Sequence, residues 1–391
     1  RYRPWIFFGS APLFIATALL FWPHMTWSMG AKMTYVVVLY ALVVLFYTMV
    51  NLTYGSLNAV VTQDPAERGS LASFRLLFAY IGSTVMTQLV VRCEPVLSAK
   101  WPGMGYFVLA ICFAVFCIPM QIFGAKVQKE VIPPSNTGVK MSIFKQLKLS
   151  FKNRPFMMVC IMFLAQGFSL YGVSTINVYW FKYVLGDEAP MATFSLITLL
   201  PSMLGCFTSQ FWSNKLRDKG KAIGITYVGQ AVFYVLQFFL FRENISLPLL
   251  YGLGIVVQYF AGANMSLIYG MVPDTVEYSE LITKGERMDG FLNTLSSFWN
   301  KVGITIGTAG APLILELVGY VPNAAQQSPG AILALDLMKW IMPAVFCVVA
   351  LVCLLWYKLD YDTFDKLVAE LHEKRPIWAA EREREKQESL K

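Results

Sequence analysis

The sequence predicts an all-α protein that crosses a membrane many times. Of its 391 residues, 56% are hydrophobic and only 14% are charged, whereas charged residues make up about a quarter of an ordinary soluble domain. Apolar runs long enough to cross roughly 30 Å of hydrocarbon as helices recur along the chain. These runs are continuously apolar instead of alternating, which favours helices over a β-barrel.

Short polar loops separate the apolar runs. The predicted membrane helices are residues 5–22, 34–53, 71–91, 106–124, 156–178, 191–212, 222–241, 247–272, 291–318 and 337–357. The seven cysteines lie in or beside these helices without Cys-x-x-Cys spacing, so the sequence indicates neither a zinc site nor a disulfide framework.

Lysine and arginine are concentrated in alternate loops. If the chain starts in the cytoplasm, the basic residues outside are Lys32, Arg92, Lys100, Lys182, Arg242 and Lys339. Because basic residues favour the cytoplasmic side, we predict a multi-pass protein of the cell inner membrane with both ends of this chain in the cytoplasm. The net charge of +8 follows from this bias and does not indicate a nucleic-acid partner.

A long polar stretch separates four predicted helices from six. We predict an N-terminal bundle at 1–131, a cytoplasmic linker at 132–155, a six-helix bundle at 156–357 and a charged cytoplasmic tail at 358–391. If the bundles are parallel repeats, the loop at 64–68 corresponds to the loop at 274–287, and the first two helices of the second bundle have no counterpart. We therefore expect two further helices before residue 1 and twelve in all. A native ten-helix protein is the alternative.

Two basic residues fall inside predicted membrane helices, where an ionisable side chain is costly and indicates a function. Lys301 lies well inside its helix, and Arg75 lies about a turn from the cytoplasmic end of another. The repeat alignment places them on equivalent helices, so we predict that both face a central cavity. The alternative for each is a side chain that extends its charge to the membrane surface.

The predicted helix at 291–318 carries a polar face and a glycine face. Polar residues spaced by three or four positions are Thr294, Ser297, Lys301, Thr305 and Thr308. We predict that this face lines water; the alternative is a packing helix whose hydroxyls bond their own backbone. Small residues that would allow close helix packing are Gly303, Gly307 and Gly310.

The predicted helix at 34–53 and the residues after it carry a second polar stripe. Its members are Tyr40, Tyr47, Asn51, Tyr54 and Asn58. Aromatic rings beside amide groups suit a ligand with apolar faces and hydroxyl edges, which describes a sugar. The alternative is that these tyrosines anchor the helix at the membrane interface.

The predicted membrane helices lack a carboxylate for a cation site, and the sequence lacks the common catalytic motifs. The predicted helices carry no deep carboxylate that could bind Na⁺ or a proton, so a symporter would hold its cation mainly outside this sequence. The sequence has no nucleotide-binding, serine-hydrolase or zinc-protease motif, and we predict no catalytic residue, bound cofactor or metal site. An enzyme is therefore disfavoured.

Three stretches resemble the glycoside-pentoside-hexuronide:cation symporters, the family of the melibiose and glucuronide permeases. They are Tyr54 to Arg75, Met271 to Glu280, and the following residues 285–301. Shorter matches at 152–156, 181–187 and 319–323 extend the resemblance from residue 1 to about residue 361. The resemblance implies the major facilitator fold, of which this chain would hold helices three to twelve.

The resemblance also implies roles for single residues. Arg75 and Lys301 match basic residues that line the family's sugar site, and Tyr47 matches a sugar-lining tyrosine. Asn51 stands where melibiose-type members have a sugar-binding aspartate, which removes a charge-assisted hydrogen bond. Two tryptophan positions of those members are Gly55 and Met265 here, so their galactoside specificity should not be transferred.

We predict a secondary transporter that carries a sugar, glycoside or uronide together with Na⁺ or H⁺ by alternating access. Its predicted substrate-binding residues are Tyr47, Asn51, Tyr54, Arg75, Ser297, Asn300 and Lys301. Its predicted gating residues are Asp64, Glu67, Arg68, Asp274 and Glu277. Its partners are then the small polar solute and membrane lipid, and we expect a monomer. The alternatives are a lysophospholipid-type transporter, an uncoupled facilitator and a non-transporting receptor.

Overall fold

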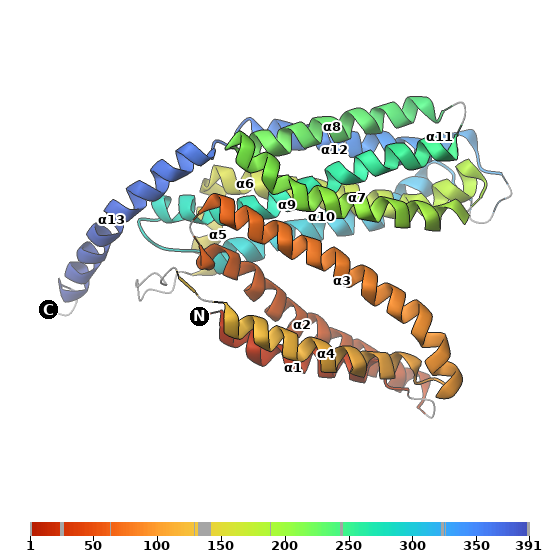
Figure 1. Cartoon of the computed structure of the whole chain (residues 1–391), viewed down its shortest axis with the longest axis horizontal. Helices are drawn as coiled ribbons and strands as arrows, with labels where there is room; N and C mark the ends of the chain where they lie inside the picture. The colour runs from red at the N-terminus through yellow and green to blue at the C-terminus, as the bar shows by residue number, and fades with distance from the viewer. Residues whose placement is uncertain are drawn as a thin grey trace. The chain divides into compact units, whose positions relative to one another are not determined.

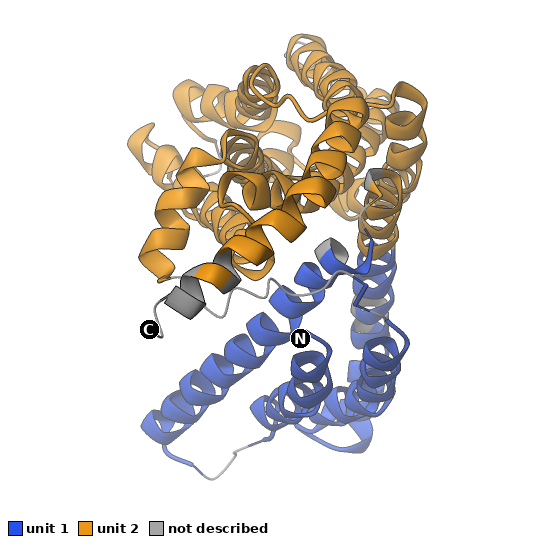
Figure 2. Cartoon of the chain, turned by 90° about the vertical axis from the view of Figure 1, so that its left-hand side faces the viewer, with its two compact units in different colours: residues 1–63, 78–134 blue, residues 64–77, 135–391 orange. Residues whose placement is uncertain are grey.

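The computed structural model describes residues 2–23, 27–62, 64–128, 130–131, 142–187, 189–242, 245–321, 324 and 326–388. These residues form helices and loops, with no β-strand among them. The chain divides into two compact units (Figure 2). Unit 1 contains residues 1–63 and 78–134, and unit 2 contains residues 64–77 and 135–391.

Unit 1 is a small helical bundle. Its helices are α1 (Arg3–Leu20), α2 (Met29–Val61), the later part of α3 (Pro65–Lys100) and α4 (Gly105–Val127). Helix α1 packs against both α2 and α4 (Figure 1). The Ser28 hydroxyl accepts a hydrogen bond from the Ala31 amide (3.4 Å), which satisfies a free N–H at the start of α2.

Unit 2 contains the remaining helices and the first residues of α3. The remaining helices are α5 (Ile143–Lys152), α6 (Arg154–Trp180), η1 (Phe181–Leu185), α7 (Ala189–Leu216), α8 (Lys219–Leu240), α9 (Leu247–Ile282), α10 (Asp289–Leu317), α11 (Pro329–Asp336), η2 (Leu337–Ile341), α12 (Met342–Leu354) and α13 (Tyr361–Glu388). Helix α6 packs along α10, α7 packs along α9, and α8 packs against both α9 and α12 (Figure 1). The segments η1 and η2 are π-helical turns that continue α6 and α11.

The predicted membrane helices are confirmed, with shifted ends. Each predicted run coincides with a helix or, at 337–357, with the end of the continuous α11–η2–α12 helix. Eight of the described helices are long and apolar enough to cross a membrane. The other two predicted spans are α3 and α10, which contain Arg75 and Lys301. The predicted linker is partly outside the described residues, including Pro133 to Asn136, and its described end forms α5.

Glycines allow α6 and α10 to pack backbone against backbone. A Cβ atom at Gly303 would collide with the backbone oxygen of Leu164, and one at Gly307 would collide with that of Phe168. A Cβ atom at Gly310 would meet nothing within 4 Å. The predicted close-packing face is therefore confirmed for the first two glycines and wrong for Gly310.

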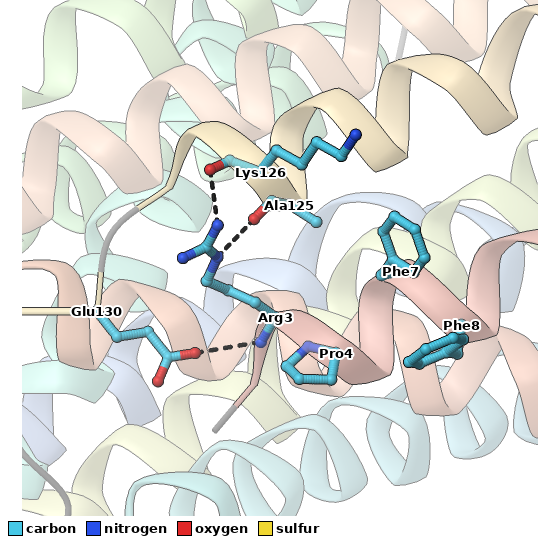
Figure 3. A pocket seen from close by; sticks show the side chains of 7 residues that line it. All are labelled: Arg3, Pro4, Phe7, Phe8, Ala125, Lys126 and Glu130. Atoms are coloured by element: carbon cyan, nitrogen blue, oxygen red, sulfur yellow. Dashed lines mark hydrogen bonds between the residues drawn. The ribbon is translucent and has the colours of Figure 1, made fainter.

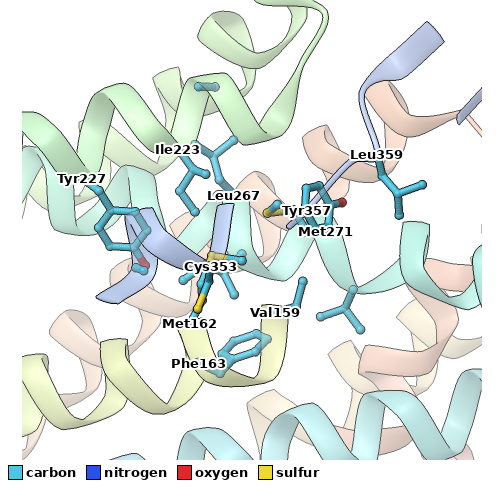
Figure 4. Close-up of a cluster of buried hydrophobic side chains, with 14 of the residues drawn as sticks. Val159, Met162, Phe163, Ile223, Tyr227, Leu267, Met271, Cys353, Tyr357 and Leu359 are labelled. Atoms are coloured by element: carbon cyan, nitrogen blue, oxygen red, sulfur yellow. The ribbon is translucent and has the colours of Figure 1, made fainter. Parts of the chain in front are cut away.

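A buried apolar cluster fixes the ends of α6, α8 and α9 that lie nearest to α13 (Figure 4). Met271 of α9 lies in this cluster with Phe163 of α6 and Ile223 of α8. Leu371 and Trp378 of α13 belong to the same cluster. The predicted charged tail forms the helix α13, and its first part packs against the bundle.

Candidate functional site

Charged side chains, all buried except the partly exposed Arg375, cluster at the end of α9 in unit 2. We call them the charge cluster, and its members are Arg68, Lys219, Asp274, Glu277, Glu280, Arg287, Asp289 and Arg375. They come from the start of α3, the start of α8, the end of α9, the segment before α10, the start of α10, and α13. Burying so many charges is costly unless each is paired, so the pairing has to be specific.

Glu277 is the centre of the charge cluster and is fully buried. Its carboxylate accepts hydrogen bonds from Arg68 Nη2 (2.7 Å), Arg287 Nη1 (3.1 Å) and Arg375 Nη2 (3.1 Å). One carboxylate thus bonds guanidinium groups from three separate parts of unit 2.

Asp274 forms a second buried pair one helical turn earlier on α9. Lys219 Nζ donates to its carboxylate (2.6 Å) and to the backbone oxygen of Gly270 (2.8 Å). Arg68 Nη1 lies 3.7 Å from the same carboxylate, so Arg68 contacts both Asp274 and Glu277. Arg68 has no exposed surface, which means that the start of α3 is fixed to α9 by an inaccessible cation.

Glu280 and Asp289 provide further carboxylates for Arg287 and Arg375 in the charge cluster. Arg287 donates to Glu280 (2.8 Å) and lies 2.9 Å from the carboxylate of Asp289. Burial alone would lower the pKa of Arg287, but the carboxylates of Asp289, Glu277 and Glu280 outweigh it and raise the pKa. The pKa of Arg375 is also raised, mainly by its hydrogen bond to Glu280. Both guanidinium groups therefore stay charged in the folded protein.

The structure brings together three of the five predicted gating residues, namely Arg68, Asp274 and Glu277. Asp64 and Glu67 are exposed, and the Asp64 carboxylate accepts the Ala66 amide (2.9 Å) at the start of α3. Sequence reasoning missed Lys219, Asp289 and Arg375, and it did not single out Glu280 and Arg287 within the loop at 274–287. The three-residue spacing of Asp274, Glu277 and Glu280, which puts them on one helix face, was the available signal.

Arg75 lies on α3 in unit 2 and is half-buried. Its guanidinium lies 5.6 Å from the ring centroid of Tyr269 on α9, a distance that permits a cation–π interaction. The Tyr269 ring in turn contacts Phe163 edge to face, with centroids 4.8 Å apart. Tyr269 fixes Arg75, and no sequence pattern had identified it.

The polar face of α10 is accessible within unit 2. Lys301 is exposed and Ser297 is half-buried, whereas Asn300 is 8% exposed and donates to the backbone oxygen of Phe163 (3.4 Å). Asn300 thus points to α6, about 100° round the helix from Lys301. The Thr305 hydroxyl bonds the Lys301 backbone oxygen (2.9 Å), so hydroxyls on this face do bond their own helix.

The predicted sugar-binding stripe lies on α2 in unit 1. Tyr47 and Tyr54 are exposed and Asn51 is half-buried, and their three- and four-residue spacing puts them on one helix face. The side chain of Asn58 is outside the described residues. These residues belong to unit 1, whereas Arg75 belongs to unit 2.

A cavity of about 720 Å³ lies at the start of α1 in unit 1 (Figure 3). It is lined by Arg3, Pro4, Phe7, Phe8, Ala125, Lys126 and Glu130, and includes no predicted site residue. Arg3 donates to the backbone oxygens of Ala125 and Lys126 (2.7 Å each), which are free acceptors at the end of α4. The charge of Arg3 thus stabilises a helix end, and the cavity is a weak candidate for a substrate site.

Lys339, predicted to be one of the basic residues on the outer side, is 1% exposed within the helix α11–η2–α12. Its Nζ lies 3.4 Å from the ring centroid of Trp180, 4.5 Å from that of Phe181 and 4.7 Å from that of Trp340. The Trp180 indole N–H donates to Asp336 (2.7 Å). The helix begins at Pro329, eight residues before the predicted start, so Lys339 lies inside it and an aromatic cage surrounds its ammonium group.

The sequence profile of the family described as MFS/sugar transport protein matches residues 1–361. The chain is 27% identical over 384 residues to the glucuronide carrier protein homolog of Escherichia coli, covering 96% of this chain and 81% of that protein. It is also 27% identical to a putative sulfoquinovose importer of Salmonella typhimurium, covering 96% and 78%.

Among solved structures, the E. coli fucose:proton symporter FucP superposes with a TM-score of 0.62 at 15% identity, covering 92% of this chain and 84% of that one. At this identity the similarity shows the fold alone, which is the predicted major facilitator fold. Together with the profile match over residues 1–361, it establishes that this chain belongs to the MFS/sugar transport protein family of multi-pass membrane transporters.

Proposed function

We propose that the protein carries an anionic sugar or glycoside across the membrane together with Na⁺ or H⁺. The observation that carries the proposal is the half-buried guanidinium of Arg75, which lies against Tyr269 within an apolar part of α3. A cation in such a place suits a carboxylate or sulfonate of the substrate, because a charge-assisted hydrogen bond is strongest away from water. The names of the relatives, a glucuronide carrier homolog and a putative sulfoquinovose importer, support the same class of substrate.

Lys301 would provide a second cation in unit 2, and Ser297 a hydroxyl on the same face of α10. In unit 1, Tyr47, Asn51 and Tyr54 would contact the ring and hydroxyl groups of the sugar. Asn300 was predicted to bind substrate, but its burial against α6 supports a positioning role instead.

The charge cluster would form the gate at the cytoplasmic end. Arg68 is on α3, and opening this end would separate it from Asp274 and Glu277 on α9. The pairs would then exist in one state of the transport cycle and be replaced by water in the other. This assignment rests on the proposed orientation, in which the protein lies in the cell inner membrane with both ends of this chain in the cytoplasm.

Solute uptake into energised vesicles tests the proposed function. The panel contains neutral glycosides, uronides and sulfonated sugars, with and without Na⁺ and with a proton uncoupler. We expect accumulation of the anionic sugars, abolished either by the uncoupler or by removing Na⁺, and an Arg75→Gln variant that loses anionic uptake. Competition by neutral glycosides but not by anionic ones would refute the anionic class. Equilibration without accumulation would refute cation coupling, and absence of any glycoside uptake would refute sugar transport.

A further inference from the structure

Helix α5 has two neighbouring stripes of opposite character that face solvent. Phe144 and Phe151 are seven residues apart, or about two helical turns, and are 83% and 55% exposed. The neighbouring stripe contains Lys145, Lys148 and Lys152, which are all exposed. Together the stripes form a surface of two phenylalanines bordered by three lysines, which we call the α5 face.

Helix α5 is held against the rest of unit 2 from its other side. Ser150 is buried, and Asn153, the residue after α5, donates from Nδ2 to the backbone oxygen of Thr275 on α9 (2.8 Å). The Asn153 side-chain oxygen also accepts the Phe156 amide (3.0 Å) and caps the start of the spanning helix α6. Helix α5 therefore lies at the start of α6, a helix long and apolar enough to span a membrane, and beside the charged end of α9.

Neither water nor a neutral lipid surface matches the α5 face. Two large aromatic side chains exposed to water are unfavourable, whereas the boundary of a bilayer accepts such rings. Three adjacent lysines favour anionic headgroups, and basic amphipathic helices bind such surfaces through apolar contact and charge together. The chain supplies no acidic residue within α5 to neutralise these lysines.

We propose that the α5 face binds the membrane surface beside α6 and selects anionic phospholipid there, with Phe144 and Phe151 in the acyl boundary and the lysines at the phosphates. This interaction is independent of the transported substrate. It would anchor the segment between the first four membrane helices and the last six, next to Thr275 and the charge cluster.

Photocrosslinking in nanodiscs tests the proposal. The intact protein carries p-benzoylphenylalanine in place of Phe144 or Phe151, with Lys148→p-benzoylphenylalanine as the matched control on the basic stripe. The nanodiscs contain equal amounts of phosphatidylglycerol and phosphatidylcholine, and the mass of the intact protein identifies each adduct. We expect lipid adducts at 144 and 151 but few at 148, with phosphatidylglycerol enriched at least about fivefold, the factor that one lysine near the surface would give.

A variant with Lys145, Lys148 and Lys152 changed to Gln supplies the second arm. We expect its phosphatidylglycerol enrichment at 144 to fall to the bulk ratio while lipid adducts persist. Equal labelling by both lipids in the parent would overturn the selection of anionic lipid. Crosslinks from 144 and 151 to the protein itself, or no adduct at all, would overturn the membrane contact.

Discussion

Replacing Glu277 with Gln should loosen the charge cluster more than any other isosteric change. Glutamine keeps the size of the side chain but removes the carboxylate that accepts hydrogen bonds from Arg68, Arg287 and Arg375. Removing one partner of a buried ion pair costs about 3–5 kcal/mol, because the remaining charge has lost both water and its counter-ion. In Glu277→Gln, this cost would be distributed over the three guanidinium groups that lose their shared counter-ion.

A cost of this size changes the opening equilibrium of the charge cluster by about 100-fold to several thousand-fold, at a factor of ten for each 1.4 kcal/mol. Hydrogen exchange measured by mass spectrometry reports the opening without knowledge of the substrate. In Glu277→Gln, amides near Arg68 at the start of α3 should exchange at least about 100-fold faster than in the parent.

Asp362→Asn is the matched control, because it also changes a carboxylate to an amide at an arginine pair. Asp362 pairs with Arg217 (2.9 Å), but the two side chains are 70% and 60% exposed. Exposed pairs contribute little, so exchange near Arg68 should be unaffected. If Glu277→Gln accelerated exchange no more than Asp362→Asn, the view that Glu277 holds α3 to α9 would be wrong.

Three further predictions concern unit 2. Gly303→Ala should destabilise the protein by about 1–3 kcal/mol in thermal unfolding through collision with α6, whereas Gly310→Ala should be neutral or stabilise it by up to about 1 kcal/mol. A double-mutant cycle of Lys339→Met and Trp180→Phe should give a favourable coupling of about 1–2 kcal/mol, and zero coupling would exclude a cation–π contribution. Lys301→Gln should weaken binding of an anionic sugar about 10- to 100-fold in a competition assay and leave a neutral glycoside unchanged.

The helices could be predicted from the sequence because length and continuous apolarity decide them. Boundaries were less accurate where a helix begins with small or polar residues, as at Pro329, because those residues add little hydrophobicity. Lys339 counted only as a basic residue of the outer side, since a linear pattern cannot show that Trp180 and Phe181 lie around it.

Candidate site residues were predictable only in part, for a physical reason. Arg68, Asp274 and Glu277 stood in loops that the repeat alignment paired, so their proximity could be expected. Lys219 counted only as one more basic residue, because its burial depends on Asp274 being one helix away. A residue whose role depends on a partner far away in the sequence produces no periodic pattern in the sequence around it.

The helices α3 and α10 each carry a basic residue within an apolar part, Arg75 and Lys301, and these two are the residues proposed to meet the substrate. A protein would not retain this cost for structure alone, because leucine at Arg75 or Lys301 would insert more readily. The attraction between a bound anionic substrate and these basic residues offsets the cost of burying them. Substrate binding should therefore stabilise α3 and α10 more than the other helices. Binding of an anionic sugar should therefore raise the thermal stability of the parent and have a smaller effect on Arg75→Leu, even if the variant alone is the more stable protein.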